Sequence, residues 1–160
     1  MVSDLINRLT NRWYEECEER SLPTDSYHAL RKGLRGFLPT DAPAGIAYRD
    51  EHPFVLALAP EALLFFTPPA DDQLLDALAI PIGGIHRIAI GCGRGSSIHA
   101  NYRVCTWGLT VGEGERRDLI TRRAVGAGFT SDNGGEGVMF ALAERLGWPT
   151  PLWQEAKETA

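Results

Sequence analysis

Arginine side chains are the most distinctive chemical groups in this sequence, and they gather in one segment. Residues 85–125 hold seven Arg and only three acidic residues, although the whole chain has a net charge of −5. The planar guanidinium of Arg binds carboxylates and phosphates through paired hydrogen bonds. If the strands that carry these side chains share a face, they form a positive patch suited to an acidic protein or peptide. The candidate binding residues are Arg87, Arg94, His99, Arg103, Arg116, Arg117, Arg122 and Arg123. The plainer alternative is a solvated strand face, balanced by Asp118 and an acidic N-terminal helix.

A glycine-rich segment, 91–97, follows an apolar strand and predicts a loop. Its backbone amides, with Arg94, could hold an anion. Cys92 in the same loop and the nearby His99 could serve a thiol enzyme. The glycine spacing matches neither a dinucleotide fingerprint nor a P-loop, and a flexible connector is the simpler interpretation. Cys105 should face the core, where thiols are usually inert. No metal-ligand spacing is recognisable, so we expect neither a metal nor a cofactor.

Composition limits the class of protein. With 160 residues, 44% of them hydrophobic, the chain is long enough for one folded domain. A pI of about 5.4 disfavours nucleic acid and anionic membranes as partners. The odd number of cysteines, three, argues against a disulfide scaffold and favours reduced thiols. The N-terminus does not resemble a signal peptide, and no apolar stretch approaches the length of a membrane span. We therefore expect a cytoplasmic protein without stable membrane association.

Two helices are predicted in residues 1–43. Over residues 3–20, Leu5, Leu9, Trp13 and Cys17 recur at four-residue steps, which is typical of one apolar helix face. A second helix is expected to open at Pro23, with Thr24 as its N-cap. Together they form a helical extension that precedes the main domain.

Strands are predicted after residue 44, where the apolar period shortens toward two. The expected strands cover 54–59, 62–67, 78–82, 85–90, 103–111 and 116–125. A second glycine-rich loop, 126–137, precedes a helix marked by Val138 and Leu146, and Asp132 is its expected cap. The predicted fold class is α+β, with two N-terminal helices, a bent antiparallel sheet or open barrel, and a closing C-terminal helix.

Three segments carry a resemblance to a known superfold: the hairpin at 57–66, the strand pair at 80–88 and the closing helix at 136–147. In this order they resemble the pleckstrin-homology (PH) superfold in its loose bacterial form, over residues 44–148. Residues 1–43 and the tail 149–160 lie outside the pattern. The best-known members bind phosphoinositides through basic residues in the first hairpin loop. Here that loop is Pro60-Glu61, without a base, so lipid binding is not expected.

The leading functional hypothesis is a non-catalytic protein-binding or adaptor module, such as an immunity-type or regulatory partner protein. It would bind an acidic protein or peptide through the Arg-bearing strands. The alternative is a small-ligand-binding protein or thiol enzyme that uses the loop 91–103. Homodimerisation through Trp148 and Trp153 is compatible with either.

Overall fold

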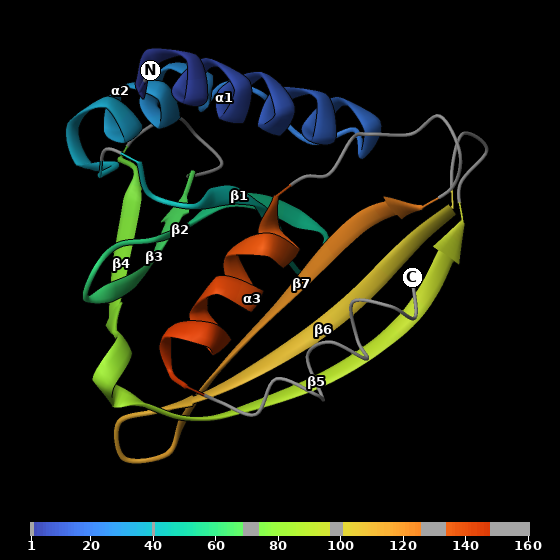
Figure 1. Ribbon diagram of the computed structural model, residues 1–160. Coiled ribbons are helices and arrows are strands. Elements are labelled where there is room, and N and C mark those ends of the chain that lie inside the picture. The colour runs from blue at the N-terminus through green and yellow to red at the C-terminus, as the bar shows by residue number, and fades with distance from the viewer. Residues whose placement is uncertain (1, 40, 69–73, 97–100, 126–133, 148–160) are drawn as a thin grey trace.

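The computed structural model describes residues 2–39, 41–68, 74–96, 101–125 and 134–147 (Figure 1). Within these ranges the chain forms three α-helices and a seven-stranded antiparallel sheet, so the predicted α+β class is confirmed. The helices are α1 (Val2–Glu19), α2 (Tyr27–Phe37) and α3 (Gly135–Arg145). The strands are β1 (Ala44–Arg49), β2 (His52–Leu58), β3 (Ala62–Thr67), β4 (Asp76–Pro81), β5 (Ile85–Ser96), β6 (Asn101–Val111) and β7 (Glu115–Val125), with the 3₁₀ turn η1 (Ile82–Gly84) before β5.

Two meanders make up the sheet. Its strand order is β4-β3-β2-β1-β7-β6-β5. The strands β1–β4 pair in sequence order, the strands β5–β7 do the same, and β7 pairs with β1 to join the two meanders. That junction is narrow, and its register places Tyr48 opposite Ile120. β4 and β5 form the two edges of an open sheet (Figure 1).

Two hydrophobic clusters lie on opposite faces of β1–β3. On one face, α1 and α2 bury Ile6, Trp13 and Leu30 against strand residues such as Val55 and Phe66. On the other face, α3 packs against β1, β2 and β7. The cluster on this face includes Phe54, Phe65, Trp107, Leu109, Met139 and Phe140. We call the sheet face toward α3 the inner face and the opposite one the outer face. The N-terminal helices therefore share a core with the sheet.

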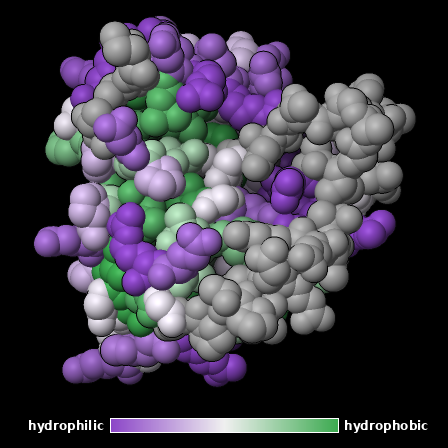
Figure 2. All heavy atoms as spheres, in the orientation of Figure 1, coloured by the Kyte–Doolittle hydropathy of each residue, from purple (hydrophilic) through white to green (hydrophobic). Residues whose placement is uncertain are grey.

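The surface follows this arrangement. In Figure 2, the top of the molecule, where α1 and α2 lie, is mainly hydrophilic. Hydrophobic atoms reach the surface below these helices, on the side of β3 and β4. There the edge strand exposes Ala77 and Ala79 and leaves Leu78 half-buried.

Both N-terminal helices form where the apolar spacing predicts them. Trp13 and Cys17 are buried, as the four-residue period requires. The second helix begins later than expected, because its N-cap is Ser26 rather than Thr24. The Thr24 carbonyl instead accepts a hydrogen bond from the amide of Tyr27, at 3.2 Å, in the turn that leads into α2.

The start of α3 also differs from the prediction. The helix begins at Gly135, its N-cap is Gly134 with a φ of 81°, and the expected cap, Asp132, lies outside the described residues. Gly134 forms a bridge to Ile46 of β1. A Cβ on Gly135 would lie only 2.4 Å from the Ile46 carbonyl oxygen. Glycine is therefore needed here because the helix start lies directly against a strand.

The glycine-rich segment after Ile90 is a strand rather than the predicted loop. β5 continues to Ser96 and pairs with β6 along its whole length, from Ile85 opposite Val111 to Ser96 opposite Asn101. Glycine weakens a strand locally, but the hydrogen bonds to a long partner strand offset this loss of stability.

Candidate functional site

The predicted arginine set is divided between the two faces of the sheet. Directly paired residues share a face, and consecutive residues of a strand alternate. The outer face carries Arg87, Arg116 and Arg122. The inner face carries Arg94, Arg103, Arg117 and Arg123. The adjacent pairs at 116–117 and 122–123 therefore point in opposite directions, and the seven side chains do not form one patch. His99 lies outside the described residues.

Arg103 is part of the core. It is 1% exposed and forms an ion pair with Glu136, which is 2% exposed, in the first turn of α3. Arg103 Nε donates a hydrogen bond to Glu136 Oε2 at 3.0 Å, and Arg123 Nη1 lies 3.7 Å from Oε1. The positive end of the α3 dipole further favours the carboxylate. Arg103 thus holds the closing helix against β6, and its buried guanidinium is not presented to a partner.

The other inner-face arginines lie nearer to solvent. Arg94 is exposed on the edge strand. Arg117 pairs with Glu115 at 2.7 Å. Such exposed pairs contribute little to stability, since water and salt screen them.

Arg122 has a distinct setting on the outer face. Its guanidinium lies 4.6 Å from the ring centre of Tyr102 and 5.7 Å from that of Tyr48. Among the described residues, no carboxylate lies within ion-pair distance of it. By contrast, Arg116 on the same face pairs with Asp118 at 2.8 Å. Stacking restricts the orientation of the Arg122 side chain and leaves the edge of its guanidinium for hydrogen bonds.

A hollow of about 200 Å³ lies beside Arg122, between the end of α1 and strands β6 and β7. Its lining residues are Arg20, Tyr48, Glu51, Val104, Ile120 and Arg122. The guanidinium carbon of Arg20 lies 4.5 Å from the centre of the Tyr48 ring, and Arg20 forms an ion pair with Glu16. Burial, followed by the negative charge of Glu16, keeps the pKa of Tyr48 above its ordinary value, so this hydroxyl stays neutral. The hollow therefore offers two guanidinium groups near one aromatic ring.

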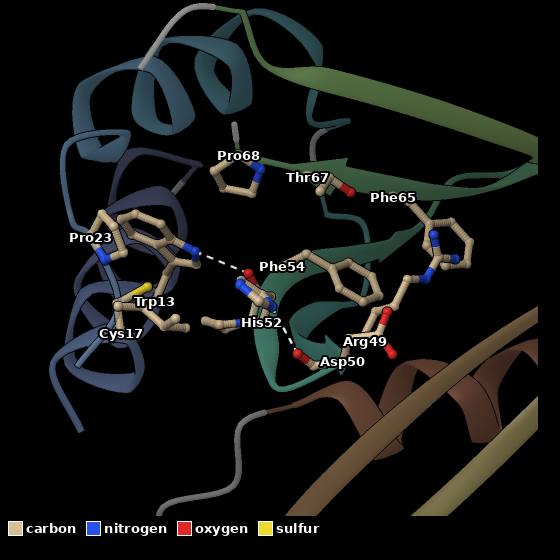
Figure 3. A pocket seen from close by; sticks show the side chains of 12 residues that line it. Trp13, Cys17, Pro23, Arg49, Asp50, His52, Phe54, Phe65, Thr67 and Pro68 are labelled. Carbon is tan, nitrogen blue, oxygen red and sulfur yellow. Dashed lines mark hydrogen bonds between the residues drawn. The ribbon is translucent and has the colours of Figure 1, made fainter. Parts of the chain in front are cut away.

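A second, larger cavity lies near the C-terminal end of α1 (Figure 3). It has a volume of about 310 Å³ and is lined mainly by apolar side chains, with Trp13, Phe54 and Phe65 the largest. Trp13 Nε1 donates a hydrogen bond to the carbonyl of Pro53 at 3.1 Å, which fixes the indole in the wall. None of its lining residues comes from 91–103, the segment expected to hold a small ligand.

The mouth of this cavity contains the polar groups. Asp50 and Glu51 form the tight turn between β1 and β2 with φ values of 49° and 67°, which are uncommon for residues with side chains. His52 Nδ1 lies 2.8 Å from the Asp50 carbonyl oxygen, as Figure 3 shows. The sequence pattern does not indicate this cavity. The spacing of Trp13 and Cys17 predicts only helix-core positions, and no local signal places them beside the β1–β2 turn.

The cysteines occupy three different settings. Cys92 is exposed on β5, and Cys105 is buried on β6, as expected from its strand. Cys17 is buried under α1, and burial raises the pKa of its thiol to about 11. The expected partner of Cys92 in a thiol enzyme, His99, is outside the described residues.

Other features bear on the class of site. Within the described ranges, no group of three His, Cys, Asp or Glu residues is placed to hold a metal ion. No helix in the same ranges is long and apolar enough to cross a membrane. Trp148 and Trp153, the expected dimer contacts, fall outside the described part of the chain.

No protein-family model matches the sequence, and no curated protein matches it.

Proposed function

We propose that this protein is a non-catalytic protein-binding module that binds an acidic segment of a partner protein on its outer face. The observation that carries the proposal is Arg122, stacked on two tyrosines beside a hollow and without a carboxylate partner in the described chain. We also propose that the domain is PH-like. A meander of four strands, a meander of three and a closing helix support that assignment.

The outer face of β5–β7 has the shape that an extended partner segment requires. The helices α1 and α2 pack on β1–β3, and α3 packs on the inner face. Gly91 and Gly93 on β5 leave nothing within 4 Å of the position of a Cβ, and Thr106 beside them is exposed. A strip of small residues lets another backbone approach closely.

The charge of this face favours an acidic occupant. On the outer face of β5–β7, three arginines outnumber one carboxylate, Asp118, and the hollow beside it is lined by Arg20 and Arg122 against one carboxylate, Glu51. An Asp or Glu of the partner would enter the hollow and accept hydrogen bonds from Arg122, with Arg20 also in its lining. Because Arg122 is already held by stacking, little side-chain entropy is lost on binding.

The test is a fluorescence-anisotropy titration with a labelled peptide of alternating Glu and Gly. Arg122→Glu should weaken binding by at least about tenfold, which corresponds to about 1.4 kcal/mol. Arg35→Glu makes the same charge change at an exposed position of α2 and should leave binding nearly unchanged. Equal weakening by both variants would mean that only net charge matters. Unchanged binding in Arg122→Glu would remove this face as the binding surface.

The cavity favours a second candidate function, the binding of a small apolar molecule. Its volume of about 310 Å³ lies at the lower end of the range for ligand sites, and its wall is mostly aromatic and aliphatic. Leu22→Trp would fill the cavity and should abolish binding of a fluorescent apolar probe such as anilinonaphthalene sulfonate. Leu78→Trp, at a half-buried position on β4, is the matched control and should not. Probe binding that survives Leu22→Trp would exclude the cavity as the site.

A further inference from the structure

Two cysteines lie directly opposite each other in the sheet. In the register of β5 and β6, Cys92 is paired with Cys105, between the pairs that Gly91 and Gly93 form with Thr106 and Val104. Opposed residues of antiparallel strands have Cα atoms about 4.5–5.5 Å apart. A disulfide spans about 4.4–6.8 Å between Cα atoms. Directly paired residues project from the same face of a sheet, so the two side chains lie beside each other.

The two thiols differ in access to solvent. Cys92 is exposed on an edge strand, and both of its chain neighbours are glycines, which carry no side chain to screen it. Cys105 is fully buried beside Trp107 in the inner cluster. Burial raises the pKa of the Cys105 thiol to about 12, so it stays protonated while Cys92 meets reagents from solution.

We propose that Cys92 and Cys105 form a redox-active dithiol site, which a hydroperoxide converts to an intramolecular disulfide and a small thiol reductant restores. The site is independent of the acidic-segment binding proposed above. It is a modification site on the inner face and edge of the sheet, whereas Arg122 lies on the outer face.

The chemistry proceeds in two balanced steps. The Cys92 thiolate attacks one oxygen of hydrogen peroxide, the O–O bond breaks, and the released hydroxide takes up the thiol proton to leave water and Cys92 sulfenic acid. The sulfur of Cys105 then attacks the sulfenic sulfur. The S–O bond breaks, the hydroxyl leaves as a second water with the Cys105 proton, and the S–S bond forms. Two electrons pass from the thiols to the peroxide.

Cys17 is an internal control for this assignment. It is buried in the other hydrophobic cluster, beneath α1, on the far side of β1–β3 from α3. It therefore should keep its thiol when the other two cysteines react.

The experiment treats the reduced, full-length protein with a small excess of hydrogen peroxide, then denatures it in an alkylating reagent. We expect an intact mass that shows one alkyl group and a loss of about 2 Da for the disulfide, and a proteolytic map that links Cys92 to Cys105. Dithiothreitol should restore all three thiols. Cys17→Ser should behave like the wild type. Cys105→Ala should stop at Cys92 sulfenic acid, which dimedone traps.

Three results would overturn the proposal. One is a Cys92–Cys92 dimer as the main product while Cys105 stays reduced. Another is oxidation of Cys92 to sulfinic acid in the wild type at the rate seen in Cys105→Ala. The third is no oxidation of any cysteine by excess peroxide. The first and third results come from the wild type alone and are repeated in Cys17→Ser, so they keep the test decisive even if Cys105→Ala folds poorly.

Discussion

The start of α3 allows a sharp test of how the closing helix is held. A Cβ at Gly135 would lie 2.4 Å from the backbone oxygen of Ile46, about 1 Å closer than ordinary van der Waals contact. Because the Cβ is fixed by the helix backbone and the Ile46 oxygen belongs to the backbone of β1, no side-chain rotation relieves the clash, and Gly135→Ala must push the helix away from β1. Such overpacking costs about 1–3 kcal/mol. The shift also strains the ion pair between Glu136 and Arg103, while the better helix propensity of Ala returns only about 1 kcal/mol. At so short a distance the upper end of the overpacking range, about 3 kcal/mol, applies, and after the helix-propensity gain we expect a net loss of about 2 kcal/mol.

The assay is thermal unfolding followed by circular dichroism, with Gly137→Ala as the matched control. Gly137 lies in the same first turn, is exposed, and leaves nothing within 4 Å of a Cβ. For a chain of this size, each kcal/mol shifts Tm by about 2–4 °C. Gly135→Ala should therefore lower Tm by about 4–8 °C, and Gly137→Ala should raise it by about 2 °C. Equal Tm values for the two variants would refute the close packing of α3 on β1.

Three further predictions concern buried charge, a strained turn and alkaline pH. Glu136→Gln should lower the free energy of unfolding, measured in urea, by about 3 kcal/mol, because Arg103 then stays buried without a counter-charge. The double variant Arg103→Met with Glu136→Leu should recover most of that loss. Glu51→Gly should raise Tm by a few degrees, about 1 kcal/mol, because a φ of 67° is strained for a residue with a side chain; an unchanged Tm would mean that this turn is relaxed. Thermal stability should fall as pH rises from 9.0 to about 11, because the Cys17 and Cys105 thiols both ionise more readily in the unfolded chain, and Cys17→Ala should make that fall shallower without removing it.

The arginine faces show how far local pattern can be taken. Strand alternation alone separates Arg116 from Arg117, because neighbouring residues of a strand point to opposite faces. The pairing of Arg103 with Glu136 could not be found this way, since 33 residues separate them and no motif joins a strand residue to the start of a distant helix. The cluster of arginines predicted a charged surface, but one of these residues, Arg103, is buried in the core.

The length of β5 illustrates a conflict between local and long-range effects. Three glycines in 91–95 favour a loop, because glycine has the most backbone freedom to lose. The structure nevertheless extends the strand to Ser96, since β6 supplies a partner for every residue from Arg87 to Ser96. This extension is what places Cys92 opposite Cys105. A loop at 91–97 would have left the two thiols unrelated.

The sequence by itself predicted the three described helices and six of the seven described strands, in their order, but not β1 at Ala44–Arg49. The four-residue apolar steps of α1 and the alternation of β6 are set by backbone geometry within a few residues, so they can be recognised without knowing what lies beside them. Only the tertiary structure decided which chemical groups meet: Arg122 with two tyrosines, Trp13 with the β1–β2 turn, and Cys92 with Cys105. These contacts join segments that are far apart in the chain, and they depend on strand register and helix docking, which are fixed by the burial of both hydrophobic clusters together.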